Sequence, residues 1–153
     1  MTLDFTIVEG TPTDKNGKYV DCWNDYKAGY RRLYTDGIGT CLSIALYDPD
    51  MKKGALAHIG GIRAWDVPKE VYPENIVNTL LSELGKYTLL EAFLAGESRR
   101  LEKISPQVKR DLTNLNIPII GEDLGDSGTH QGRAVSLDCI TGELTVYRLP
   151  SLF

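Results

Sequence analysis

The spacing of hydrophobic residues predicts a chain built mainly from short strands. The clearest segment is Cys41–Tyr47, in which large aliphatic residues alternate with small or polar ones. Successive side chains of a strand point to opposite faces. One face of this segment should therefore carry its three large aliphatic side chains, Leu42, Ile44 and Leu46. The other face should carry Cys41, Ser43, Ala45 and Tyr47, with a buried helix as the competing interpretation.

The same reasoning places the remaining elements. Further strands are predicted over Thr2–Val8, Arg32–Tyr34, Gly54–Ile59, Thr88–Ala95, Ile117–Ile120, Arg133–Cys139 and Leu144–Leu149, the last two as a hairpin around Thr141-Gly142. Helical spacing predicts a helix over Pro73–Leu84, ended by Gly85. Ser105-Pro106 should cap and open a second helix that runs to about Leu115. Loops or turns are expected at Gly10–Tyr30, Thr35–Thr40 and Gly121–Gly132.

Composition narrows the class of protein. A chain of 153 residues with 42% hydrophobic and 25% charged residues is typical of one globular domain, 1–153, with 10–30 as a loop or inserted segment. The net charge of -4 argues against nucleic acid as a partner, because nucleic-acid binders usually present a basic face. The longest apolar runs are far shorter than the ~20 residues of a membrane-spanning helix. The first residues lack the features of a signal peptide, so we expect a cytoplasmic protein without membrane insertion.

The cysteines and histidines limit the chemistry. The three cysteines, Cys22, Cys41 and Cys139, are odd in number and widely spaced, which is not a disulfide framework. The two histidines, His58 and His130, cannot complete a structural zinc site at normal ligand spacing, so no metal is expected. The thiols are therefore either inert core groups or reactive ones.

Cys41 is the best candidate for a reactive thiol. It follows the turn Gly37-Ile38-Gly39-Thr40, which can bring backbone N–H groups close to the sulfur. Such groups lower a thiol pKa and can form an oxyanion hole. His58 lies 17 positions further on, and two consecutive strands could place it beside Cys41. The competing interpretations are a small buried cysteine and a hydrogen-bonded interior histidine.

Five segments resemble the chemoreceptor glutamine deamidase (CheD) family. Thr35–Pro49 is similar to the family's T-x-G-x-G-S-C turn, apolar strand and Y-D-P turn, and Gly54–His58 is similar to its G-x-x-A-H segment. Further along, three shorter segments resemble its C-terminal motifs: Glu122–Gly125, Gly132-Arg133 and Thr141–Val146. The resemblance spans Thr35 to Leu149 and so covers most of the chain.

The resemblance implies a specific activity. Cys41 would be the nucleophile, His58 its base, and Thr35 the residue whose hydroxyl holds the histidine. Backbone N–H groups of Gly39 and Thr40 would stabilise the oxyanion. The reaction implied is hydrolysis of a protein glutamine side chain to glutamate and ammonia, with no cofactor. Chemoreceptor cytoplasmic domains would be the substrate, and a CheC-type phosphatase a further partner.

The resemblance also implies a fold. We expect an α+β protein, a layered α/β sandwich with mixed or antiparallel sheets and outer helices. The same broad architecture occurs in cysteine hydrolases of the cytotoxic necrotizing factor type.

The chain departs from the family pattern in several loops. The departures are the long segment Gly10–Tyr30, Ile59–Gly61 after His58, Ala95–Glu97 after the middle strand, and the loop 125–132. They support one alternative, a cysteine amidohydrolase with a different substrate. A second alternative, a non-catalytic module that docks on a CheC-type phosphatase or a chemoreceptor, stays open because the resemblance also implies such partners. Asp36 is either solvated or tunes His58. Glu97–Arg100 and Lys109-Arg110 are expected to be solvated surface.

Overall fold

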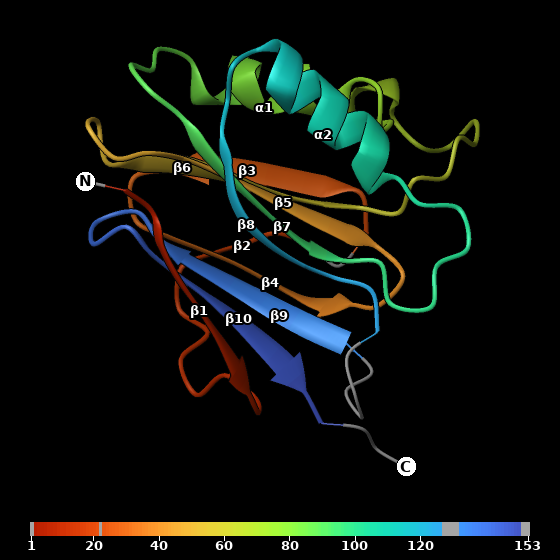
Figure 1. Cartoon of the computed structure of the whole chain (residues 1–153), viewed down its shortest axis with the longest axis horizontal. Coiled ribbons are helices and arrows are strands. Elements are labelled where there is room, and N and C mark those ends of the chain that lie inside the picture. The colour runs from red at the N-terminus through yellow and green to blue at the C-terminus, as the bar shows by residue number, and fades with distance from the viewer. Residues whose placement is uncertain (1, 22, 127–131, 151–153) are drawn as a thin grey trace.

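The computed structural model describes residues 2–21, 23–126 and 132–150, and it shows two β-sheets packed face to face (Figure 1). Sheet A has the strand order β1 (Asp4–Glu9), β10 (Glu143–Leu149), β9 (Gly132–Asp138), β4 (Arg32–Ile38) and β2 (Lys18–Tyr19). Sheet B has the order β3 (Asp25–Gly29), β6 (Lys53–Ile59), β5 (Leu42–Asp48), β7 (Glu91–Gly96) and β8 (Ile119–Leu124). Both sheets are mixed, because β1–β10, β2–β4 and β7–β8 pair in parallel and the other neighbours pair antiparallel.

The helices of the described chain cover the outer face of sheet B, as Figure 1 shows. They are α1 (Ile76–Leu84) and α2 (Ser105–Asn114), preceded by the short 3-10 turn η1 (Lys69–Val71). Gly85 ends α1 with φ of 72°, a left-handed conformation that glycine adopts without strain. The predicted α+β sandwich with outer helices is confirmed, and both helices lie over the same sheet.

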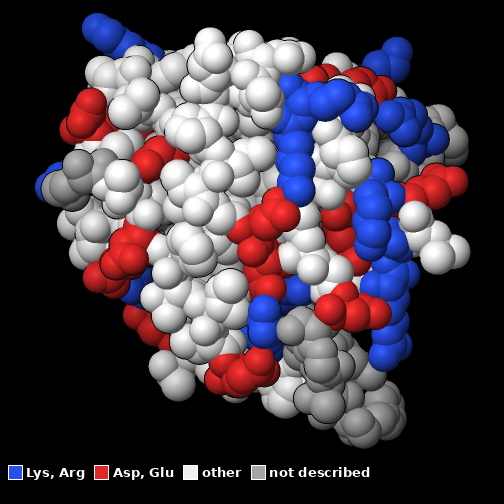
Figure 2. Space-filling model, in the orientation of Figure 1, with Lys and Arg blue, Asp and Glu red and all other residues white. Residues whose placement is uncertain are grey.

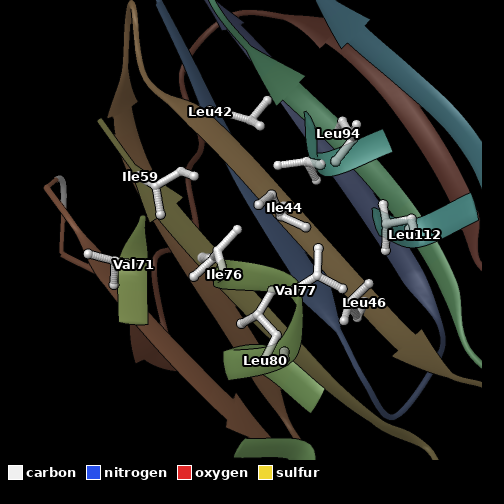
Figure 3. Close-up of a cluster of buried hydrophobic side chains, with 14 of the residues drawn as sticks. Leu42, Ile44, Leu46, Ile59, Val71, Ile76, Val77, Leu80, Leu94 and Leu112 are labelled. Atoms are coloured by element: carbon white, nitrogen blue, oxygen red, sulfur yellow. The ribbon is translucent and has the colours of Figure 1, made fainter. Parts of the chain in front are cut away.

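Sheet B has two differently packed faces. The outer face packs against the helices, where Leu42, Ile44 and Leu46 are fully buried among apolar side chains of α1 and α2 (Figure 3). The inner face packs against sheet A and carries Ala45 and Tyr47. The predicted alternation along this strand is therefore confirmed. Burial of one such aliphatic side chain contributes about 1.5–3 kcal/mol to folding.

The loop predicted over Gly10–Tyr30 is wrong in its second half. Strands β2 and β3 lie there, and β3 forms the edge of sheet B beside β6. Both are short edge strands with partly exposed side chains, so their pairing rests on backbone hydrogen bonds. Hydrophobic alternation is weak in such a segment, and this explains why the sequence did not reveal them.

Two predicted loops belong partly to strands. The turn expected at Thr35–Thr40 begins inside β4, which continues to Ile38 around a β-bulge. Thr35 pairs with Val135 and Ile38 with Arg133, so β4 has one residue more than β9 in this interval. Likewise β8 extends to Leu124 into the predicted loop Gly121–Gly132, and residues 127–131 of that loop lie outside the described residues.

Candidate active site

The strand register places Cys41 and His58 on one face of sheet B. In the antiparallel pair β5–β6, Ser43 lies opposite His58 and Leu42 lies opposite Ile59. Cys41 directly precedes β5, so by alternation its side chain lies on the same face as Ser43. Cys41 and His58 are thus diagonal neighbours at the end of the two strands, within the range over which cross-strand side chains interact.

Thr35 reaches His58 from the other sheet. Its Oγ1 lies 2.9 Å from His58 Nδ1 and 2.9 Å from the carbonyl oxygen of Val20. A hydroxyl has one hydrogen, and a carbonyl oxygen can only accept. Thr35 therefore donates to Val20 and accepts from Nδ1–H of His58. This tautomer leaves the lone pair on Nε2, the nitrogen that a general base would use.

His58 is fully buried and uncharged near neutral pH. Burial lowers the pKa of the imidazole from 6.5 to about 4, while the negative charges of Asp36 and Asp25 act in the opposite direction. Its Nε2 is buried and has no hydrogen-bond partner among the described residues. A buried nitrogen with an unused lone pair is costly in a purely structural role, so its presence supports a chemical role.

Asp36 contributes to the electrostatics of His58. Its carboxylate accepts hydrogen bonds from the hydroxyls of Tyr19 at 2.6 Å and Tyr34 at 3.3 Å. Because its charge raises the pKa of His58, the structure favours the tuning role over plain solvation. Burial together with this charge also raises the pKa of Tyr34 well above its usual value, which keeps the phenol protonated as the donor.

The cysteine turn is held against the segment that follows β7. The carbonyl oxygens of three successive residues each accept a hydrogen bond from this segment: Gly39 from Ser98 N–H at 3.0 Å, Thr40 from Arg100 Nη1 at 3.2 Å, and Cys41 from Glu97 N–H at 2.8 Å. Gly96 makes the close approach possible, since a Cβ there would lie 2.2 Å from the Cys41 carbonyl oxygen. The half-buried Cys41 thus sits on a fixed backbone.

Gly39 and Thr40 were the two predicted oxyanion donors, and the N–H of Gly39 already has a hydrogen-bond partner. Gly39 donates its N–H to the carbonyl oxygen of Gly37 at 3.1 Å, inside the turn. A role for Gly39 as an oxyanion donor therefore requires this bond to open when substrate binds. The corresponding assignment of Thr40 remains a prediction.

The expectation that Glu97–Arg100 is solvated surface is wrong for its first half, because Glu97 and Ser98 are buried. The Glu97 carboxylate accepts hydrogen bonds at the start of α2, from Ile104 N–H at 2.7 Å and from Ser105 N–H at 2.9 Å and Oγ at 2.6 Å. Glu97 therefore caps α2, a role that the sequence had suggested for Ser105, which is instead the first helical residue.

Arg133 is a site residue to which the sequence assigned no role. Its guanidinium is fully buried and bonds Asp123, Gly125 and the segment after β7. The sequence signal was present in the Gly132-Arg133 motif, but nothing local indicated its partners. A buried arginine usually requires a carboxylate, and Asp123 lies ten positions earlier.

The surface around this end of sheet B carries exposed apolar side chains and charges of both signs. The loops that leave β6 and β7 there carry Trp65, 98% exposed, and Leu101, 99% exposed. Figure 2 shows Lys and Arg side chains interspersed with Asp and Glu on the right-hand side of the visible face, where α2 and the segment after β7 lie in Figure 1. Exposed large apolar side chains often mark protein interaction sites.

Other candidates lie elsewhere or outside the described residues. Cys139 is fully buried, and burial raises the pKa of its thiol to about 12. Cys22 and His130 lie outside the described residues, as does most of the altered loop 125–132. Within residues 2–21, 23–126 and 132–150, no group of three or more His, Cys, Asp or Glu side chains could hold a metal ion. No helix among these residues is long and apolar enough to cross a membrane.

The known proteins that this chain resembles carry the same name. The chain is 32% identical over 131 residues to the "Probable chemoreceptor glutamine deamidase CheD" of Methanosarcina barkeri, covering 75% of this chain and 85% of that protein. It is 31% identical over 134 residues to the chemoreceptor glutamine deamidase CheD of Thermotoga maritima, covering 76% and 82%. The protein of the same name from Bacillus licheniformis is 29% identical over 136 residues, covering 75% and 79%. No protein-family model matches the chain.

Proposed function

This chain belongs to the CheD family of chemoreceptor glutamine deamidases, and from that premise we propose that it hydrolyses the side-chain amide of protein glutamine residues. In this proposal Cys41 is the nucleophile, His58 is its base, and Thr35 orients the base. The observation that carries the proposal is the hydrogen bond between Thr35 Oγ1 and His58 Nδ1, which leaves the buried Nε2 with an unused lone pair that can accept a proton.

The first step forms a tetrahedral intermediate between the thiol and the glutamine amide. His58 Nε2 takes the proton of the Cys41 thiol, and the sulfur attacks the carboxamide carbon of glutamine. A pKa of about 4 makes the buried His58 imidazole a weak base before the thiolate forms. The thiolate formed beside it would favour the protonated imidazolium, because opposite charges stabilise one another strongly in a buried site. Nδ1–H stays hydrogen-bonded to Thr35 throughout, so the ring keeps its orientation.

The second step restores the enzyme. The tetrahedral intermediate collapses, the C–N bond breaks, and the imidazolium gives its proton to the leaving nitrogen, which departs as ammonia. Water then attacks the thioester with His58 again as the base, which yields glutamate and the free thiol. Backbone N–H groups of the turn before Cys41 would hold the oxyanion in both steps.

The substrate and setting follow from the same family. We propose chemoreceptor cytoplasmic domains as the substrate and a CheC-type phosphatase as a regulatory partner, with the reaction taking place in the cytoplasm. The exposed Trp65 and Leu101, on the loops that leave β6 and β7, offer contact surface for a protein substrate.

Ammonia release and intact mass on candidate receptor cytoplasmic domains test the activity. Each converted glutamine should add about one mass unit and release one ammonia as its thioester forms and hydrolyses. Cys41→Ala should abolish both signals, while Cys139→Ala, the matched control at a buried thiol, should retain them.

Failure of this assay separates the alternatives. If no receptor domain is modified but iodoacetamide labels Cys41 near neutral pH in a His58-dependent way, the protein is a cysteine amidohydrolase with a different substrate. If Cys41 is also inert, catalysis is excluded and a docking role takes its place.

A further inference from the structure

The hydrogen bonds to the carbonyl groups of the turn around Cys41 determine where the backbone N–H groups of this turn point. The carbonyl oxygens of Gly39, Thr40 and Cys41 are all held by donors from the segment after β7. A peptide group is planar and trans, so its C=O and N–H point in opposite directions. The bond from Ser98 to Gly39 O therefore directs the Thr40 N–H away from that segment. The bond from Arg100 to Thr40 O does the same for the Cys41 N–H.

The segment that holds the turn has an unusual backbone. Gly96 has φ of 132° and Glu97 has φ of 62°. A non-glycine residue with positive φ is strained by about 1–2 kcal/mol, and such a conformation persists only where its surroundings fix it. The capping bonds of the Glu97 carboxylate fix one side of this segment, as described above.

Arg133 fixes the other side. Its Nη1 donates to Gly96 O at 3.2 Å and to Ser98 Oγ at 3.0 Å, its Nη2 to Gly125 O at 2.6 Å, and its Nε to Asp123 Oδ2 at 2.8 Å. The planar guanidinium thus joins the ends of β7 and β8 in one rigid arrangement. The chain of contacts runs from Arg133 through Ser98 to Gly39, and so to the Thr40 N–H.

We propose that Arg133 is a positioning residue for the oxyanion donors of this site. It acts through its hydrogen bonds to Gly96 and Ser98. The inference rests on the proposed function, because it assigns the turn's N–H groups to the oxyanion of amide hydrolysis.

Arg148 provides a matched control. It also bonds Asp123, with Nη2–Oδ1 at 2.6 Å and Nε–Oδ2 at 3.1 Å. None of its hydrogen bonds or ion pairs in the described structure reaches Gly96 or Ser98. Burial opposes ionisation of Asp123, but the bonds from Arg148 and Arg133 together keep its pKa below the ordinary value. Replacing either arginine thus weakens the same ion-pair cluster, and only Arg133 holds the segment after β7.

The experiment compares Arg133→Lys with Arg148→Lys in the full chain. Lysine keeps the positive charge but lacks the planar fork that bonds several acceptors at once. We expect Arg133→Lys to lower kcat about 10- to 100-fold, somewhat less than outright loss of an oxyanion donor, with KM nearly unchanged. Arg148→Lys should keep kcat within about threefold, in line with the modest worth of partly exposed ion pairs. Equal losses of kcat in the two variants, or no loss in folded Arg133→Lys, would overturn the proposal.

Two further measurements keep the test decisive. Where Arg133→Lys does not fold, Ser98→Ala carries the test, since it removes one acceptor of Arg133 and leaves the arginine with Asp123; unchanged kcat there overturns the proposal. The pH profile of Cys41 alkylation by iodoacetamide, read by peptide mass, needs no substrate. If the pH midpoint of Cys41 alkylation shifts upward in Arg133→Lys and not in Arg148→Lys, this supports the positioning role even if receptor deamidation fails. An unshifted midpoint contradicts the role.

Discussion

The layer between the two sheets has a cysteine at each end, and the two ends differ in what surrounds the thiol. Cys139 lies at the end where Gly54 pairs with Tyr47, and its carbonyl oxygen accepts a hydrogen bond from the Tyr47 hydroxyl at 2.8 Å. Its thiol is fully buried, and burial raises its pKa to about 12. Cys41 lies at the opposite end of β5, half-buried, with His58 on the same face.

The comparison shows that enclosure in the same layer does not by itself make a thiol reactive. At the Cys139 end, burial disfavours the thiolate and no buried base offsets it among the described residues. At the Cys41 end, the apolar layer gives way to a hydrogen-bonded pair, Thr35 and His58, that joins the two sheets. The difference between the ends therefore lies in a few polar groups placed by strand register.

The largest effect should come from removing the base. His58→Asn keeps an N–H donor near the position of Nδ1 but has no counterpart of Nε2, so Thr35 can still be bonded while the thiol loses its proton acceptor. We expect kcat for deamidation to fall about 10²- to 10⁴-fold, the usual contribution of general acid–base catalysis. Steady-state ammonia release measures this loss, with Cys139→Ala as the control expected to stay within about twofold of wild type. Normal activity in the His58→Asn variant would contradict the idea that a nearby base distinguishes Cys41 from Cys139.

A smaller effect should follow from uncoupling the two sheets. Thr35→Val keeps the shape of the side chain but leaves Nδ1–H of His58 and the Val20 carbonyl without their partner. An unsatisfied buried group costs about 1–3 kcal/mol, so kcat should fall about 10- to 100-fold as the ring loses its fixed tautomer and orientation. Thr35→Ser restores the hydroxyl and should recover most of the rate. Equal activity of the Val and Ser variants would show that the hydroxyl plays no part.

The smallest effect concerns stability and pH. The pKa of His58 is about 4 in the folded protein and about 6.5 when unfolded, so the unfolded chain binds more protons between these values and stability falls as pH drops. Between pH 7 and 5.5 the loss should be about 1 kcal/mol. Urea unfolding at both pH values measures it. His58→Asn should lack this component, and an identical pH dependence in the variant would contradict the neutral, buried state of the ring.

The sequence allowed prediction of those parts of the site that lie on strands with a regular alternation of hydrophobic residues. Alternation along Cys41–Tyr47, followed by a short turn and a second apolar run, predicted two adjacent strands, and their register sets Ser43 opposite His58 with Cys41 just before the same strand. The resemblance to a known family added the role of Thr35, whose contact with His58 crosses between sheets.

The remainder depended on partners far away in the sequence. Glu97 and Ser98 are polar and follow a strand, which suggests solvent exposure, yet they are buried because the start of α2 and Arg133 satisfy them. Strand β3 has no strong hydrophobic pattern, and only its backbone pairing with β6 reveals it. No window of neighbouring residues contains such information.

The close spacing of Thr35, Cys41 and His58 along the chain also affects how this protein can diverge over evolutionary time. All three lie on β4, β5, β6 and the short connections between them. Because side chains alternate in a strand, insertion of a single residue inside β5 or β6 would turn the positions beyond it to the opposite face. Insertions in the loops after β6 and β8 leave this register untouched. A lineage can therefore lengthen or rewrite its outer loops, and so change what it recognises, while the reactive segment is inherited at fixed length.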